Sequence, residues 1–428
     1  MPKKLLHAWK TKIGRRQFLK ISGAALISTF SLPYQLQAQA SITNPLFWIV
    51  NIPSEPFRDS RRPHRHAGID ALLGAMASKG LMFYRGSATA AFSGPQGLIH
   101  PDDVVLIKVN AQWKYRGCTN SDVIRGLIQA ILDHPGGFRG EVVIMENGQG
   151  RGSLNCDTGA AYGGDTSVQA NANDPGHSFL YLVNTVFKDS RVSAFLLDSI
   201  ASRFIGGNEH QVDGYRRFEN VSYPCFTTAG GRRVELREGI WQGNAYSSNL
   251  KLINVPVLKH HDTGGSEITA ALKHMYGVLS MADGQSPFRH YSGLGETCGK
   301  MMVSVRTPVL NLVDAIWVSH SSLTGYPENT TVRLNQLLAG QDPVALDYWA
   351  AKHLMYPIDQ NSRHHPDYQG ISQWLDAALQ TINGRGGLAN PEMGILVDQV
   401  TRTESEMQVV KRNALPDISP IVNFLLEG

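Results

Sequence analysis

The chain has 428 residues, with 40 basic and 36 acidic side chains and a formal net charge of +4. Residues 1–40 hold seven of the basic residues and no acidic residue, so the remaining chain carries a net charge of 4 − 7 = −3. This balance gives no support for nucleic-acid binding. A hydrophobic content of 42% with 18% charged residues is typical of a globular protein and excludes a disordered chain.

The first predicted segment is a twin-arginine signal peptide in residues 1–40. Two adjacent arginines, Arg15 and Arg16, precede an apolar run over 21–32, and an A-x-A cleavage site ends at Ala40. The run is about a dozen residues, shorter than the ~20 that a spanning helix needs, which favours cleavage over an uncleaved anchor. We therefore expect the twin-arginine export machinery as a partner, a periplasmic location and no stable membrane insertion after cleavage.

Residues 41–428 alternate between short apolar runs and helical patterns, which predicts an α/β domain. Its first part is predicted to contain strands at 47–50, 104–107 and 141–145 and helices at 67–79 and 121–132. Continuous apolar runs indicate strands that are buried on both faces. We therefore expect a mainly parallel sheet flanked by helices.

The middle of the chain has a different composition. Residues 147–177 are rich in Gly, Asn and Asp, and a helix is predicted at 178–187. Residues 200–250 contain turns and short antiparallel strands, such as 232–236. A loop as long as the first of these stretches is usually functional or disordered. We predict a loop-rich or small antiparallel β insertion, or a second lobe, at about 147–250.

The α/β pattern returns in the last part of the chain. Strands are predicted at 252–255 and 309–318, and helices at 268–279 and 343–355. In the last helix, Asp342 followed by Pro343 reads first as an N-cap and a proline in the first turn. We find no internal repeat.

Polar side chains follow three of the predicted strands. They are Lys108, Asn110, Glu146, Asn147, Lys259, His260, His261 and Asp262. In open parallel α/β sheets, ligands bind beyond the carboxyl ends of the strands. If these strands are parallel neighbours, the polar side chains converge on one crevice; the alternative is that each is a solvated loop residue.

The segment 254–277 predicts an anion site. A Gly-Gly-Ser sequence at 264–266 opens the predicted helix, and the N–H groups of a helix start bind anions. Thr269 and Lys273 are four residues apart, which places them on one helical face. We expect Lys108, Lys259 and Lys273 to bind the anion, with Asn110 and Thr269 as further substrate-binding residues. The alternative is a plain N-cap at Ser266 and an exposed Lys273.

Two residues are predicted to be catalytic. His260 is the candidate general acid/base, because the unperturbed pKa of histidine is near neutral. Asp314 lies within an apolar run, where a carboxylate needs a partner or a raised pKa, so it is the candidate to orient or charge-balance His260.

The cofactor is not identified by the sequence. Neutral histidines are common ligands of transition metals, but no H-x-x-x-H or H-E-x-x-H pattern is present, so a metal is left open. The four cysteines are far apart, which argues against a zinc ribbon and excludes a ferredoxin-type cluster. In an oxidising compartment they are expected to form one or two disulfides, and three full pairings exist.

Together these segments resemble the domain-of-unknown-function 362 family. The matching motifs are KVN at 108–110, PVLKHH at 256–261, a Thr followed by ALKHMYG at 271–277, VDA at 313–315 and AGQDPVALD at 339–347. The chain departs from the family pattern at the shifted or doubled histidine of the second motif, at His274, which replaces the usual asparagine, and at Ala315, which replaces the usual glycine. Some relatives carry ferredoxin-type cysteine runs; this chain has none, so no iron–sulfur cluster is expected.

The resulting functional prediction is an exported soluble enzyme of unknown reaction. It would act on a small anionic substrate in a crevice at the carboxyl ends of the strands. Two alternatives stay open: a non-catalytic periplasmic ligand-binding or accessory protein, and a redox protein with a bound cofactor. Neither a G-x-G-x-x-G fingerprint nor a P-loop is present.

Overall fold

The computed structural model describes residues 44–159, 163–201, 203–261, 266–284 and 289–415. Contacts within the chain separate two units, Met1–Ser41 and Ile42–Gly428, and the described residues all belong to the second unit. The predicted signal peptide lies outside the described residues. Within them, no helix has both the length and the apolar character needed to cross a membrane.

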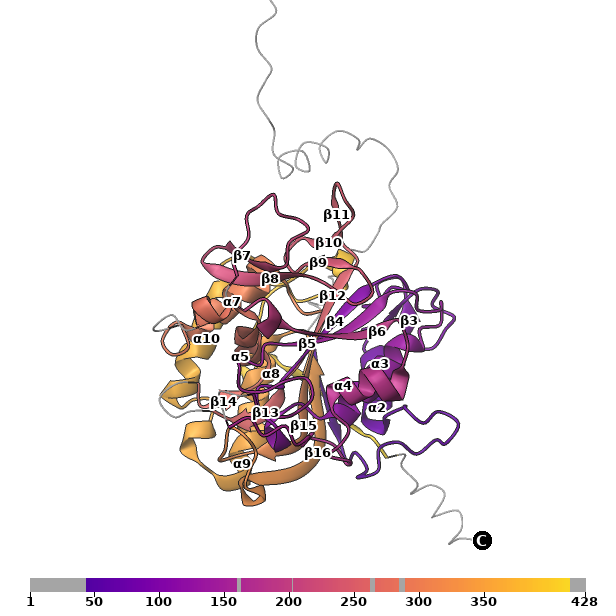
Figure 1. Cartoon of the computed structure of the whole chain (residues 1–428). Helices are drawn as coiled ribbons and strands as arrows, with labels where there is room; N and C mark the ends of the chain where they lie inside the picture. The colour runs from indigo at the N-terminus through magenta and orange to yellow at the C-terminus, as the bar shows by residue number, and fades with distance from the viewer. Residues whose placement is uncertain (1–43, 160–162, 202, 262–265, 285–288, 416–428) are drawn as a thin grey trace, which may run out of the picture. The chain divides into compact units, whose positions relative to one another are not determined.

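The main sheet is mixed and mostly parallel (Figure 1). Its strands lie in the order β17 (Gln408–Asn413), β1 (Pro45–Val50), β16 (Thr331–Gly340), β15 (Leu310–Ser319), β12 (Leu250–Val255), β4 (Val104–Val109), β5 (Glu141–Glu146) and β6 (Val192–Leu196). The strands from β15 to β6 are parallel, whereas β16 pairs antiparallel with β15 and β1. Every residue of β4, β5 and β12 is buried, as expected for parallel strands covered on both faces. The predicted fold class is confirmed.

The chain adds parallel strands toward one edge of this sheet and later toward the opposite edge. From β4 it moves to β5 through α3 (Ser121–Leu132), and from β12 it moves the opposite way to β15 through α5 (Ala271–Met275) and α7 (Leu294–Lys300). Parallel crossovers are right-handed, so the two movements place their helices on opposite faces. Figure 1 shows α3 beside α2 (Ala67–Ala77) on one side and α5 with α7 on the other. The strand order therefore reverses between β4 and β12, the place where open α/β sheets bind ligands.

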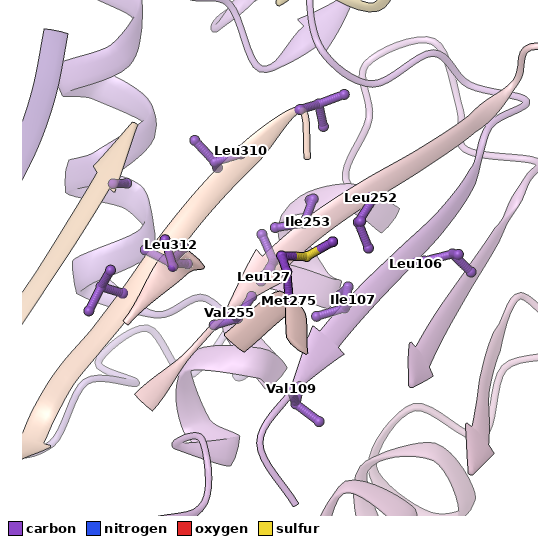
Figure 2. Packing of buried hydrophobic residues seen from close by; sticks show 14 of the residues in the cluster. Leu106, Ile107, Val109, Leu127, Leu252, Ile253, Val255, Met275, Leu310 and Leu312 are labelled. Atoms are coloured by element: carbon purple, nitrogen blue, oxygen red, sulfur yellow. The ribbon is translucent and has the colours of Figure 1, made fainter. Parts of the chain in front are cut away.

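The core lies between the central strands and these helices. Figure 2 shows Leu127 of α3 and Met275 of α5 close to aliphatic side chains of β4, β12 and β15. The labelled strand residues are Leu106, Ile107, Val109, Leu252, Ile253, Val255, Leu310 and Leu312, all fully buried. Burial of each such side chain stabilises the fold by about 1.5–3 kcal/mol. This packing therefore holds the central strands firmly in place.

Helix α3 forms over the residues predicted for it. The side chain of Asn120 accepts hydrogen bonds from the backbone N–H groups of Asp122 and Val123, as an N-cap does. Apolar residues at helical spacing face the core, namely Val123, Ile124, Leu127, Ile128 and Ile131.

The predicted antiparallel insertion is present between β6 and β12. Its strands are β7 (Gly214–Phe218), β8 (Val221–Thr227), β9 (Arg233–Glu235), β10 (Gly239–Trp241) and β11 (Tyr246–Ser247). The buried carboxylate of Glu141, at the start of β5, accepts hydrogen bonds from Thr228 Oγ1 at 2.6 Å and from Gly230 N at 3.1 Å. These bonds fix the small sheet to the amino end of β5, away from the strand ends that the ligand prediction concerns.

The helix predicted at 268–279 is wrong in its first part. Ile268–Thr269 form the short strand β14, which pairs antiparallel with β13 (Val257–His260), and α5 begins only at Ala271. Ser266 therefore opens no helix, and Thr269 faces Lys259 across the pair rather than sharing a helical face with Lys273. Glu267 adopts a positive φ of 60°, a turn conformation that no helical periodicity reveals.

Candidate functional site

A cavity of about 380 Å³ lies at the carboxyl ends of β4 and β5, beside β13, β14 and α5. Five of the seven predicted site residues line it: Lys108, Asn110, Lys259, Thr269 and Lys273. The structure thus brings the five predicted binding residues together at the strand-order reversal. Residues from other parts of the chain complete the wall, among them Trp113, Arg151, His274, Tyr276 and His290.

The floor of the cavity contains a buried ion pair. Lys108 and Glu146 end neighbouring strands, and Lys108 Nζ lies 2.5 Å from Glu146 Oε2. Lys108 Nζ also donates to the carbonyl of Val109 at 3.0 Å, and Glu146 Oε1 accepts from the N–H of Ala111 at 3.2 Å. Burial lowers the pKa of Lys108 and raises that of Glu146, while each charge opposes the shift of the other. Burial thus opposes the charges of both partners, while their mutual attraction favours them.

A glycine leaves the space that this ion pair occupies. A Cβ atom on Gly277 would lie 2.9 Å from Lys108 Nζ and 3.4 Å from Lys108 Cε. Because real Cβ atoms essentially never come this close to another heavy atom, any larger residue would displace the ammonium. The close contact at Gly277 is thus with the ion pair, and no positive φ calls for glycine there.

Lys259 is a buried amine of the cavity wall. Its Nζ donates to the carbonyl of Gly117 at 2.7 Å and to that of Leu323 at 3.1 Å. Burial lowers the pKa of Lys259 to about 7, and the positive charges of Lys273 and Lys108 act in the same direction. The two carbonyls bind two of the N–H groups, so the third position on Nζ carries either a proton or a lone pair.

Helix α5 carries the third lysine and a histidine. The carboxylate of Asp347 accepts from the N–H groups of Ala271 and Leu272, at 2.6 and 3.0 Å, and so holds the start of this helix. Lys273, 8% exposed, places its Nζ 5.2 Å from the centre of the Tyr276 ring. Burial raises the pKa of Asp347 to about 8.

His274 is fixed as a neutral imidazole. The Asn254 amide nitrogen donates to the Ala271 carbonyl and to Asn311 Oδ1, both at 2.9 Å, so its oxygen faces His274 Nδ1 at 2.7 Å. We assign the proton to Nδ1 from this network, which leaves Nε2 as an acceptor. Nε2 is buried, and the Val109 carbonyl lies near enough to the ring to act on the pKa of His274. Burial, followed by the nearby charges of Lys108 and other lysines, lowers the pKa of His274 well below its usual value.

Asn110 links the strands on either side of the reversal. Its side-chain oxygen accepts from the N–H of Val257 at 2.9 Å, and its own N–H donates to Thr119 Oγ1 at 2.8 Å. Thr119 in turn donates to the carbonyl of Val255. Asn110 therefore positions the end of β12 and the start of β13 as well as lining the cavity.

The two predicted catalytic residues lie elsewhere. His260 Nδ1 is 3.0 Å from His364 Nε2, and His364 Nδ1 is 3.5 Å from the carboxylate of Asp359. Asp314 is fully buried and accepts from the N–H groups of Asn120 and Ile316, at 2.7 and 3.0 Å. Burial raises the pKa of Asp314 to about 7. The structure thus does not place His260 and Asp314 together or on the cavity wall, and Asp314 holds the start of α3.

The remaining predictions concern capping, metals and cysteines. Asp342 caps α8 (Pro343–Trp349), as predicted. In the described ranges, no group of three or more His, Cys, Asp or Glu residues has an arrangement that could hold a metal ion. Asp262 and the two glycines of the 264–266 sequence lie outside those ranges. All four cysteines are buried, and none is bridged in the structure.

Some cavity residues escaped sequence reasoning. Trp113, Arg151 and His290 belong to irregular segments, so no periodic signal marks them. His274 differs, because it stands directly after Lys273 in a motif that the resemblance singled out. Its interaction with Asn254, which follows from the packing of α5 on β12, could not be read from spacing.

Comparison with known proteins gives one family match. The family model described as Domain of unknown function (DUF362) matches residues 231–352. This supports the resemblance inferred from the motifs over that range, which includes Lys259, Thr269 and Lys273 but not Lys108 or Asn110. Searches of curated proteins and of solved structures found no match.

Proposed function

We propose that the protein is an enzyme that binds a small anion in this cavity and transfers a proton through Lys259. The observation that carries the proposal is the charge of the wall. Among the described residues that line the cavity, four basic side chains face one carboxylate; they are Lys108, Arg151, Lys259 and Lys273 against Glu146. Cationic side chains in a poorly solvated wall attract an anion far more strongly than the same side chains in water.

The size of the cavity supports a small ligand. A volume of about 380 Å³ is at the lower end of small-molecule sites. Lys273 and Lys259 line this cavity beside the Lys108–Glu146 pair, so a carboxylate or phosphate bound there would lie close to their amines. Neutral His274 lines the same cavity beside these lysines.

Lys259 supports the catalytic part of the proposal. A general acid or base works best when its pKa is near the operating pH, and burial lowers the pKa of Lys259 to about 7. Two backbone carbonyls orient the amine, so that its remaining position can give or take a proton. In this proposal Lys259 replaces His260, which is not among the residues that line the cavity.

A non-catalytic ligand-binding or accessory protein is the alternative that uses the same cavity. It shares the lysines and needs no proton transfer. The two functions differ in one result: a ligand that is bound but never converted supports the binding protein.

The experiment is a thermal-shift screen with phosphate, sulfate and small mono- and dicarboxylates. We expect at least one anion to stabilise the wild-type protein, and Lys273→Ala to weaken its affinity by roughly 10-fold to 100-fold, as loss of a charge-assisted hydrogen bond does. The control is Lys79→Ala, which removes an exposed lysine outside the cavity. An anion whose affinity is the same in wild type and in both variants would place its site elsewhere.

We also propose that the chain is exported through the twin-arginine machinery to the periplasm. Support comes from the paired arginines and the A-x-A sequence of residues 1–40. Replacing Arg15 and Arg16 by lysine should leave the precursor in the cytoplasm, as measured by immunoblots of periplasmic and cytoplasmic fractions. Normal periplasmic accumulation of the double variant would reject export by this route.

A further inference from the structure

Two of the four buried cysteines belong to neighbouring segments beside the cavity. Cys118 follows the helical turn Tyr115–Gly117, and Cys156 lies in the irregular stretch after β5. Both side chains are fully buried, and a hydrogen-bond interaction between the two thiols shifts the pKa of each. They are 38 residues apart in sequence, so folding alone brings them together.

A third segment holds the two cysteine segments in register. Gln169 accepts from the N–H of Tyr115 at 2.7 Å, and its own N–H donates to the carbonyl of Cys156 at 3.0 Å. Two residues further on, the N–H of Asn171 donates to Cys118 Sγ at 3.3 Å, and its side chain donates to the carbonyl of Cys118 at 2.9 Å. The contact between the thiols is therefore part of a backbone network rather than an accident of two side-chain rotamers.

The other two cysteines lie in different environments. Cys225 is on β8 of the small sheet, opposite Gly214 and Glu235. Cys298 lies on α7. Among the described residues, the groups that perturb these two thiols are Glu235, Arg216, Lys273 and other charged side chains, and no cysteine is one of them. Of the pairings that the sequence left open, the structure favours one bridge and two free thiols.

We propose that Cys118 and Cys156 are a redox-active pair that a protein or small-molecule disulfide oxidises to an intramolecular disulfide. The Cys118 thiolate attacks one sulfur of the oxidant and releases the other as a thiolate. Cys156 then loses its proton and attacks Cys118 Sγ, which releases the second oxidant thiol. In total the two cysteines lose two protons and two electrons, and the oxidant gains them as two thiols.

The nearby positive charges favour Cys118 over Cys156 as the first thiol to react in this proposal. Its hydrogen bond with Cys156 lowers the pKa of Cys118, and the charges of Lys259 and Arg116 act in the same direction. The same hydrogen bond, together with burial, raises the pKa of Cys156. The thiolate is the nucleophile in disulfide exchange, so the first bond should form at Cys118.

A disulfide between Cys118 and Cys156 would connect two segments of the cavity wall. Gly117, directly before Cys118, supplies one of the two carbonyls that bind Lys259 Nζ. Arg151, five residues before Cys156, lines the same cavity. A disulfide would therefore join the segment that orients Lys259 to the segment that carries Arg151. The pairing itself does not depend on the proposed anion site.

The test is a redox equilibration of the full chain followed by peptide mass mapping. Reduced protein is incubated in glutathione buffers of increasing oxidised fraction, with urea just below the unfolding transition so that buried thiols can exchange. It is then alkylated in denaturant and digested without reduction. We expect one cross-linked pair of peptides, joining Cys118 to Cys156 and two hydrogens lighter than the free thiol peptides, with Cys225 and Cys298 alkylated.

Two variants and one second measurement complete the test. Cys225→Ser should keep the cross-link, and Cys118→Ser should leave Cys156 unbridged. The oxidised protein should unfold at a higher temperature than the reduced protein, and this difference should vanish in Cys118→Ser only. Alkylation of both Cys118 and Cys156 in the most oxidising buffer, a bridge to Cys225 or Cys298, or glutathione adducts without a bridge would each overturn the proposal.

Discussion

At the scale of single residues, strand geometry decides which side chains reach the cavity. Successive residues of a strand point to opposite faces. On β13 and just beyond it, Lys259 and His261 line the cavity, whereas His260 contacts His364. The sequence could predict that a lysine and a histidine follow this strand. It could not predict which of His260 and His261 lines the cavity, because that depends on which face of β13 is directed toward the cavity.

Lys259 should give the protein a measurable pH dependence of stability. In the unfolded chain its amine holds a proton up to about pH 10.5, and in the folded protein only up to about pH 7. Between these values the unfolded state binds more protons, so the free energy of unfolding rises with pH. Urea unfolding of wild type and Lys259→Met from pH 7 to 9.5 should show their difference growing in favour of wild type. Parallel curves would mean that Lys259 titrates normally.

Gly277 should be intolerant of even one methyl group. Gly277→Ala would bring a Cβ within 2.9 Å of Lys108 Nζ and disturb the buried pair with Glu146. Overpacking of this kind costs about 1–3 kcal/mol of unfolding free energy, which chemical denaturation can measure. The matched control is Gly207→Ala, since a Cβ there meets no atom within 4 Å. Equal stabilities of the two variants would contradict the close packing of Gly277 on Lys108.

At the scale of elements, the central parallel strands were predictable, whereas β6, β16, β17 and the turn into α5 were not. Continuous apolar runs marked β4, β5, β12 and β15, because strands buried on both faces leave that signature. The segment before α5 contains apolar residues at helical spacing, yet Ile268–Thr269 pair with β13 instead. Tertiary pairing overrides local periodicity there, and the turn at Glu267 has no sequence signature.

The start of α5 depends on Asp347 of another helix. Asp347→Ala would leave the N–H groups of Ala271 and Leu272 buried without an acceptor, which costs about 1–3 kcal/mol per group. We expect the unfolding free energy of Asp347→Ala to fall by at least the cost of one such unpaired group. Anion binding should also weaken, because Lys273 moves with the helix. Asp347→Asn, which keeps one acceptor oxygen, should lose less.

A control separates this effect from a change of net charge. Asp398→Ala removes an exposed carboxylate and should leave stability within about 0.5 kcal/mol of wild type. If Asp347→Ala were as stable as Asp398→Ala, the helix start would not need Asp347.

At the scale of the whole described unit, one topological feature organises the site. The strand order reverses between β4 and β12, so Lys108, Glu146 and Lys259 meet although they come from distant parts of the sequence. The sequence predicted parallel strands with a crevice at their carboxyl ends, but not the strand order that places the reversal there. The irregular stretches that supply Trp113 and Arg151 were not predictable, because their path depends on contacts such as Gln169 with Tyr115.

The most direct test of the account is an NMR titration of protein labelled with ¹³C at the lysine side chains. Lysine-to-methionine variants assign Lys108, Lys259 and Lys273, and Lys79 serves as the internal reference. Phosphate and the carboxylates of the thermal-shift screen are added at pH 7. The account predicts that at least one anion shifts the signals of Lys259 and Lys273 and raises the pKa of Lys259, while Lys79 is unchanged. A bound anion that leaves Lys259 and Lys273 unshifted would contradict it.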